Sequence, residues 1–139
     1  YMSVYGPHEE GKTKFANLVT QFLWSIKKDE PPIIYGDGNQ TRDFVYVKDV
    51  CQANMLAATS KKKLMGEIFN VGTGKPTSLN DLVSTINKIL GKGIKPKYIK
   101  IPVKNYIAIQ QADIAKIGKF LGYKPHYTLE NGIADMLQN

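Results

Sequence analysis

The segment Gly36–Val50 constrains the fold of this chain more than any other part of the sequence. Gly36 and Gly38 predict a tight turn, because glycine adopts positive φ angles at no steric cost. In Asp43–Val47 aromatic residues alternate with valines, which is typical of a short strand. A helical pattern follows in Asp49–Thr59. A turn, a strand and a helix in direct succession predict a chain that mixes both kinds of secondary structure.

The longest amphipathic pattern is Lys12–Lys28, where apolar residues recur at helical spacing before Pro31 ends the segment. A helix is also predicted at Ser78–Leu90, since Ser78 with Asp81 forms a capping pattern and Gly91 is a stop. Further helices are predicted at Ala112–Leu121 and Leu129–Leu137, and further strands at Tyr1–Tyr5, Ile33–Tyr35, Glu67–Val71 and Lys97–Ile101. Strands and helices alternate, so the predicted class is α/β with short strands and about five helices.

The composition predicts one folded domain. The chain has 139 residues, of which 42% are apolar and 22% charged, and no apolar run is long enough to span a membrane. The lone Cys51 has no partner for an internal disulfide, so we expect a buried thiol and a reducing, cytoplasmic location. Because the chain opens with strand-like residues at Tyr1, we expect it to be part of a longer protein.

The formal net charge of +7 comes mainly from scattered lysines, which we interpret as a solvated surface, with attraction of an anionic ligand as the alternative. Nucleic acid is not expected as a partner, because Arg42 is the single arginine and no recognition motif is present. No metal site is expected either, since His8 and His126 stand far apart without ligand spacing around them.

Arg42 is the first candidate for a binding residue. It follows a polar loop, and a guanidinium binds phosphate or diphosphate oxygens in pairs. An ion pair with Asp43 or Asp49 explains the residue equally well. Tyr106 is a second candidate, either stacking on a ligand or packing the last helices together at their rim.

Lys12 is the candidate for proton transfer. It is predicted at the start of a helix, where the helix dipole favours a neutral amine, and the like charge of Lys14 acts in the same direction. A solvated loop lysine is the alternative. The Gly36–Gly38 and Gly72–Gly74 pairs either form turns or bring the backbone close to a ligand.

Taken together, several segments resemble the extended short-chain dehydrogenase/reductase family of nucleotide-sugar epimerases and dehydratases. They are Tyr1–Pro7, Gly36–Val50, Ile68–Gly74, Gln111–Asp113 and Leu121–Pro125. The resemblance implies the C-terminal portion of an NAD(P)-binding Rossmann-type enzyme. Residues 1–139 are then the substrate-binding domain with the last elements of the Rossmann sheet.

Within the family, the resemblance is greatest to heptose 6-epimerases and then to 4-epimerases of UDP-glucose. It implies that Lys12 is a catalytic acid/base and that Val4 contacts the cofactor through its backbone. Ser3 and Lys14 stand at substrate-contacting positions where the heptose enzymes have asparagine and serine, which leaves the sugar open. The other implied substrate contacts are Gln21, Tyr35, Gly36, Asp37, Gly38, Arg42 and Tyr106.

The family's glycine-rich NAD(P) loop and its Tyr-x-x-x-Lys pair precede the matched segments. We therefore expect NAD or NADP to be bound mainly by an N-terminal Rossmann half outside this chain, and the chain alone to be inactive. The implied function is epimerisation of a nucleoside-diphosphate sugar by oxidation and reduction, in a protein that forms a homo-oligomer when intact. A nucleotide-sugar dehydratase, or a non-catalytic module that binds sugar nucleotides, is the alternative.

Overall fold

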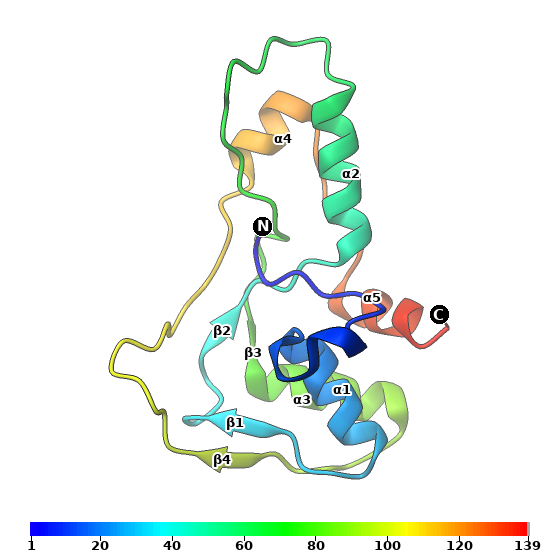
Figure 1. The fold of residues 1–139 in the computed structure, drawn as a ribbon, viewed down its shortest axis with the longest axis vertical. Coiled ribbons are helices and arrows are strands. Elements are labelled where there is room, and N and C mark those ends of the chain that lie inside the picture. The colour runs from blue at the N-terminus through cyan, green and yellow to red at the C-terminus, as the bar shows by residue number, and fades with distance from the viewer. Residues whose placement is uncertain (139) are drawn as a thin grey trace.

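The computed structural model describes residues 1–138 and has α/β architecture, as predicted (Figure 1). Five α-helices, one 3-10 helix and four short strands make up the described part. In chain order they are η1 (Glu10–Phe15), α1 (Leu18–Lys27), β1 (Ile33–Tyr35), β2 (Thr41–Arg42), α2 (Val47–Ala58), β3 (Thr77–Ser78), α3 (Leu79–Leu90), β4 (Lys97–Ile99), α4 (Ala115–Leu121) and α5 (Leu129–Met136).

The strands form two separate pairs. β1 and β4 are parallel, with Ile34 opposite Tyr98, whereas β2 and β3 are antiparallel, with Arg42 opposite Thr77. An isolated parallel bridge joins Thr41 to residue Ile109 in the loop after β4. This bridge places the segment after β4 beside β2.

The larger core lies where α1, α3 and β1 meet in the lower part of Figure 1. The apolar stripe predicted in α1 is buried, and it packs against the buried face of α3. The start and end of α3 are confirmed: the Ser78 hydroxyl oxygen accepts from the Asp81 amide at 3.0 Å, and Gly91 is left-handed at φ 63°. Burial of these two faces is the main hydrophobic stabilisation of this end of the molecule.

A second core lies between α2 and α4 in the upper part of Figure 1. The strand predicted at Asp43–Val47 is reduced to a bridge at Tyr46, and α2 already begins at Val47. The alternation itself divides the side chains between the two cores. Phe44 and Tyr46 are buried in the first core, and Val45 is buried in the second. Successive side chains of an extended segment point to opposite sides, so one short segment supplies both cores.

The single helix predicted at Lys12–Lys28 is wrong in its first third. Thr13 has φ 48° and ψ −120°, which interrupts η1, and α1 begins only at Leu18. Asn17 caps α1, because its side-chain oxygen accepts from the Val19 amide at 3.0 Å. The apolar periodicity was real from Leu18 onward, but the cap at Asn17 sets where the helix begins.

The strand predicted at Glu67–Val71 is not formed. The described backbone pairs this segment with the chain's first residues through the bond from the Met2 amide to the Val71 carbonyl, at 2.9 Å. The strand at Tyr1–Tyr5 is reduced to a bridge between Tyr5 and Tyr46. A strand needs a series of hydrogen bonds to a neighbouring backbone, so a segment that makes a single such bond stays irregular even when its sequence suits a strand.

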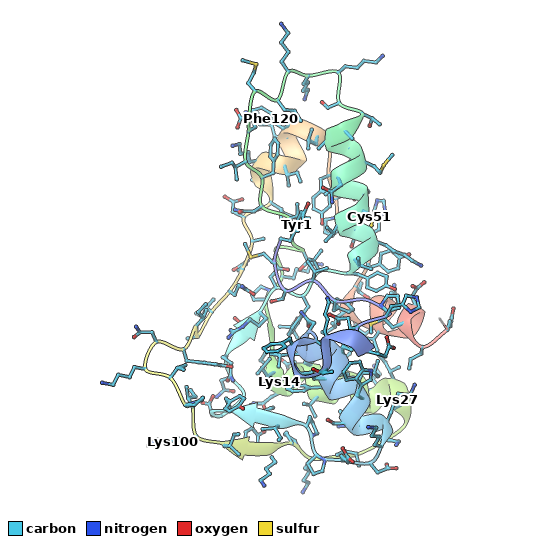
Figure 2. All side chains as sticks on the ribbon, in the orientation of Figure 1. Tyr1, Lys14, Lys27, Cys51, Lys100 and Phe120 are labelled. Carbon is cyan, nitrogen blue, oxygen red and sulfur yellow. The ribbon has the colours of Figure 1, made fainter. Side chains whose placement is uncertain are left out.

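Cys51 is exposed on α2, so the expected buried thiol is wrong (Figure 2). Figure 2 also shows Phe120 on the neighbouring α4. Within α2 only Asp49, Val50 and Ala53 are buried, which leaves Cys51 on the outer side of the helix.

Two buried carboxylates connect distant segments. Asp43 is fully buried and accepts from the Thr73 amide at 2.8 Å, the Gly74 amide at 2.9 Å and the Ala112 amide at 3.0 Å. Asp49 accepts from the His126 and Tyr127 amides at 2.9 and 3.1 Å. Hydrogen bonds to an ionised group are stronger than neutral ones, and they satisfy backbone donors that lie outside any sheet or helix.

Substitution of Asp43→Asn is expected to lower the free energy of unfolding by roughly 2 to 4 kcal/mol, because the amide group places a donor against buried donors. Asp29→Asn is the matched control, since Asp29 is 70% exposed and pairs with Lys92 at the surface, and a loss of less than about 1 kcal/mol is expected there. Denaturant titration followed by circular dichroism measures both values. Equal small losses would show that Asp43 does not organise the fold.

Candidate functional site

The Gly36–Gly38 turn has a backbone conformation that glycine adopts without strain and other residues do not. Gly36 and Gly38 have φ angles of 88° and 81°, as predicted. Asn80, the second residue of α3, donates from its amide to the Gly38 carbonyl at 3.1 Å and from its side chain to the Asp37 carbonyl at 3.0 Å. A Cβ atom on Gly38 would lie 2.1 Å from the Asn80 Oδ1 atom. The start of α3 therefore fixes this turn.

Asp37 presents its carboxylate at the tip of the turn. The Asn39 backbone and side-chain amides donate to its two oxygens at 3.0 and 2.8 Å. These hydrogen bonds, the backbone one first, hold the pKa of Asp37 below its usual range. The group is therefore ionised at neutral pH and accepts hydrogen bonds from hydroxyl or amide donors.

A cavity of about 310 Å³ lies beside this turn. It is lined by Asp37, Asn39, Gln40, Ile101, Tyr106, Ala108 and Ile109. The loop after β4 closes one side of it and the polar residues after Gly38 close the other, so two segments far apart in sequence form one recess.

Tyr106 lines this recess, and Arg42 contacts the Tyr106 ring. The guanidinium carbon lies 5.4 Å from the centre of the Tyr106 ring, and Nη1 donates to the Thr41 carbonyl at 2.7 Å. Asp43 and Asp49 instead accept from backbone amides, so the interpretation of Arg42 as their ion-pair partner is wrong. Tyr106 stacks with Arg42 and does not pack the last helices together.

Ser3 is joined to the same region through Gln110. Its hydroxyl donates to the Gln110 Oε1 atom at 2.7 Å, and the Gln110 amide donates to the Thr41 carbonyl at 3.2 Å. Ser3 itself has φ 22°, outside the conformations that most side chains adopt. No role was predicted for Gln110, because its partner stands more than a hundred positions away in the chain.

Lys12, Lys14 and Gln21 form a second group around η1. Lys12 lies in the last turn of η1, ahead of α1, so the helix-dipole argument for a neutral amine does not apply. Its Nζ atom donates to the Glu9 Oε1 atom at 2.9 Å. Lys14, labelled in Figure 2, lies over the Phe15 ring. Gln21 donates to the Ala16 and Lys14 carbonyls at 2.7 and 3.3 Å.

Val4 is the residue considered for cofactor contact. It is half-buried, and its neighbour Tyr5 donates from the backbone to the Val45 carbonyl at 3.1 Å. Among residues 1–138, no group of three or more His, Cys, Asp or Glu could hold a metal ion, and no helix is long and apolar enough to cross a membrane.

The model of the NAD dependent epimerase/dehydratase family matches residues 1–72, which is more than half of the sequence. The chain belongs to this family. It is also similar to a UDP-glucuronate 4-epimerase of Thermodesulfobacterium geofontis, with 34% identity over 96% of the chain and 39% of that relative. The chain thus spans about two fifths of the length of the curated relatives that it matches.

Solved epimerase structures have the same fold. A UDP-glucose 4-epimerase of Thermotoga maritima, solved with UDP-glucose, matches 99% of the chain with a TM-score of 0.87 and 33% identity, over 44% of its own length. An ADP-L-glycero-D-manno-heptose-6-epimerase of Helicobacter pylori matches 99% of the chain with a TM-score of 0.82 and 36% identity, over 41% of its length. The matched region is the C-terminal part of these epimerases.

Replacement of Gly38 by alanine is expected to destabilise the protein by roughly 1 to 3 kcal/mol more than Gly91→Ala. Both glycines are left-handed, but the added methyl group meets Asn80 at Gly38 and open space at Gly91. The comparison of the two denaturation midpoints separates the contact with Asn80 from the backbone strain that both variants share. Equal losses at the two positions would mean that Asn80 does not hold the turn.

Proposed function

We propose that this chain is the nucleotide-sugar-binding part of an NAD(P)-dependent epimerase. Residues 1–139 are its substrate-binding domain, together with the last elements of a Rossmann sheet, and an N-terminal half is its partner. The observation that carries the proposal is the stacking of Arg42 on Tyr106 beside the Gly36–Gly38 turn. A planar cation in contact with a ring that lines the recess suits the diphosphate of a nucleotide sugar.

Arg42 and Asp37 offer different chemistry to a ligand bound beside Tyr106. Arg42 supplies paired N–H donors for diphosphate oxygens. Asp37 is an ionised acceptor, which suits sugar or ribose hydroxyl groups and disfavours a phosphate placed directly against it. The Tyr106 ring lines the recess, and the Tyr35–Gly38 backbone is proposed to contact the ligand beside it. This division predicts an orientation, with the diphosphate toward Arg42 and hydroxyl groups toward Asp37.

The η1 group is proposed to act on the sugar. Lys12 as an ammonium donates a proton to a sugar oxygen, and the neutral amine left behind accepts one back, while Lys14, Gln21 and Ser3 contact the substrate. The cofactor, when bound, supplies hydride removal and return. Val4 contributes one backbone contact to it. The exposed Ile109 and Tyr1 side chains suit contact with the rest of a longer protein.

The direct test is turnover by the intact protein and by the 139-residue chain, with UDP-glucose, UDP-glucuronate and ADP-heptose as substrates. Epimerisation of one of them by the intact protein is expected, with none by the chain alone. Product sugars separated by chromatography give the readout. A dehydrated product would support the dehydratase alternative, since the family includes both activities in its description. Binding without any turnover by the intact protein would support the non-catalytic module.

In the intact protein, Arg42→Met is expected to raise the KM for the nucleotide sugar roughly tenfold or more, because the paired contacts to the diphosphate are lost. Arg42→Lys should recover only part of this, since an ammonium lacks the planar fork. Lys119→Met on α4 removes the same charge away from the recess and should leave KM within about twofold. If both methionine variants raised KM equally, general charge and not Arg42 would govern binding.

A further inference from the structure

A buried carboxylate lies beneath the exposed Lys12 side chain. Glu9 is 5% exposed, whereas the Lys12 side chain is 60% exposed, and the Lys12 Nζ atom lies 2.9 Å from the Glu9 Oε1 atom. A carboxylate taken out of water is costly unless its oxygens have partners. The arrangement of those partners shows what Glu9 holds in place.

Glu9 is attached to α1. The Thr20 hydroxyl, which is itself buried on α1, donates to Oε2, and the Asn17 amide donates to Oε1 at 3.3 Å. Because α1 packs in the larger core, these bonds connect Glu9 to a rigid element. Lys12 is therefore linked to α1 through one carboxylate.

The Lys12 backbone is bonded to Glu9 and not to α1, since its amide donates to the Glu9 carbonyl at 2.9 Å. η1 has no buried residue. Two non-glycine residues have positive φ angles nearby: His8, just before η1, at 64°, and Thr13, within it, at 48°. A long, exposed lysine side chain has many rotamers and populates several of them when nothing anchors its end. The anchor in this loop comes from the Glu9 side chain.

We propose that Glu9 is a positioning residue, held by Thr20, that fixes the Lys12 ammonium for its work on the sugar. An ammonium has three N–H donors, and one of them is directed to Glu9. With that bond fixed, the others point along set directions, so that a substrate oxygen meets an oriented donor. This inference rests on the proposed role of Lys12 in the reaction.

The first test is a double-mutant cycle in the intact protein with Glu9→Gln, Lys12→Met and both changes. Glutamine keeps the shape and an acceptor for Thr20 but loses the charge that holds Lys12. Glu9→Gln is expected to lower kcat roughly tenfold with KM within about twofold, and Lys12→Met about a hundredfold or more. In the Lys12→Met background, Glu9→Gln should cost less than about twofold, because its effect passes through Lys12.

The outcomes separate the two hypotheses. An equal loss from Glu9→Gln in both backgrounds would overturn the positioning role while leaving the proposed function intact. Full activity of Lys12→Met would overturn the role of Lys12 and the positioning role with it. Glu10→Gln is the matched control on the neighbouring exposed carboxylate and should leave kcat unchanged. Unfolding temperatures of all variants identify any that lose activity by unfolding.

The second test needs no turnover. Competitive acetylation of the 139-residue chain, read by mass spectrometry, compares the labelling rate of Lys12 with that of Lys14. An amine held by a carboxylate is protected, so Glu9→Gln should raise the Lys12:Lys14 ratio by about two- to fivefold, and Thr20→Val should raise it less. Glu10→Gln should leave the ratio unchanged. No change in Glu9→Gln would show that Glu9 does not hold Lys12.

Discussion

The Asp43 carboxylate holds together the parts of the chain on which the candidate site depends. Its oxygens accept from the loop that contains Thr73 and Gly74, thirty positions along the chain, and from Ala112, sixty-nine positions along. None of these donors belongs to a helix or strand, so no regular hydrogen bonding would otherwise fix them. The Asp43 carboxylate is bonded to backbone amides, and the preceding residue, Arg42, contacts the Tyr106 ring.

The sequence predicted best the features whose causes are local. The start and end of α3 depend on Ser78, Asp81 and Gly91, which stand within or beside the helix. β1 was predicted correctly for the same reason, since its apolar residues stand between proline and glycine. The α/β class followed from the order of such elements, and the family comparisons agree with it.

The features that the sequence did not predict depend on partners far away in the chain. Glu67–Val71 has a strand-like composition, but a strand also needs a neighbouring backbone. α4 begins at Ala115 and not at Ala112, and the Asp113 side chain accepts from the Ala115 amide at 2.9 Å where the helix begins. Likewise, Tyr106 was a candidate from its position in the sequence, but only the structure shows that it stacks on Arg42. Glu9 and Gln110 belonged to no motif that predicts a function. Their candidate roles come from their hydrogen bonds, Glu9 with Lys12 and Gln110 with Ser3.

The sharing of Phe44, Val45 and Tyr46 between two cores has a consequence for how the molecule opens. If the core between α2 and α4 came apart, Val45 would lose its surroundings and the same short backbone would pull on Phe44 and Tyr46. Opening of one core therefore disturbs the other, which raises the free energy of partial unfolding. Such coupling favours a single cooperative transition for this elongated chain, and it ties the integrity of the recess at Arg42 to packing at the distant α4.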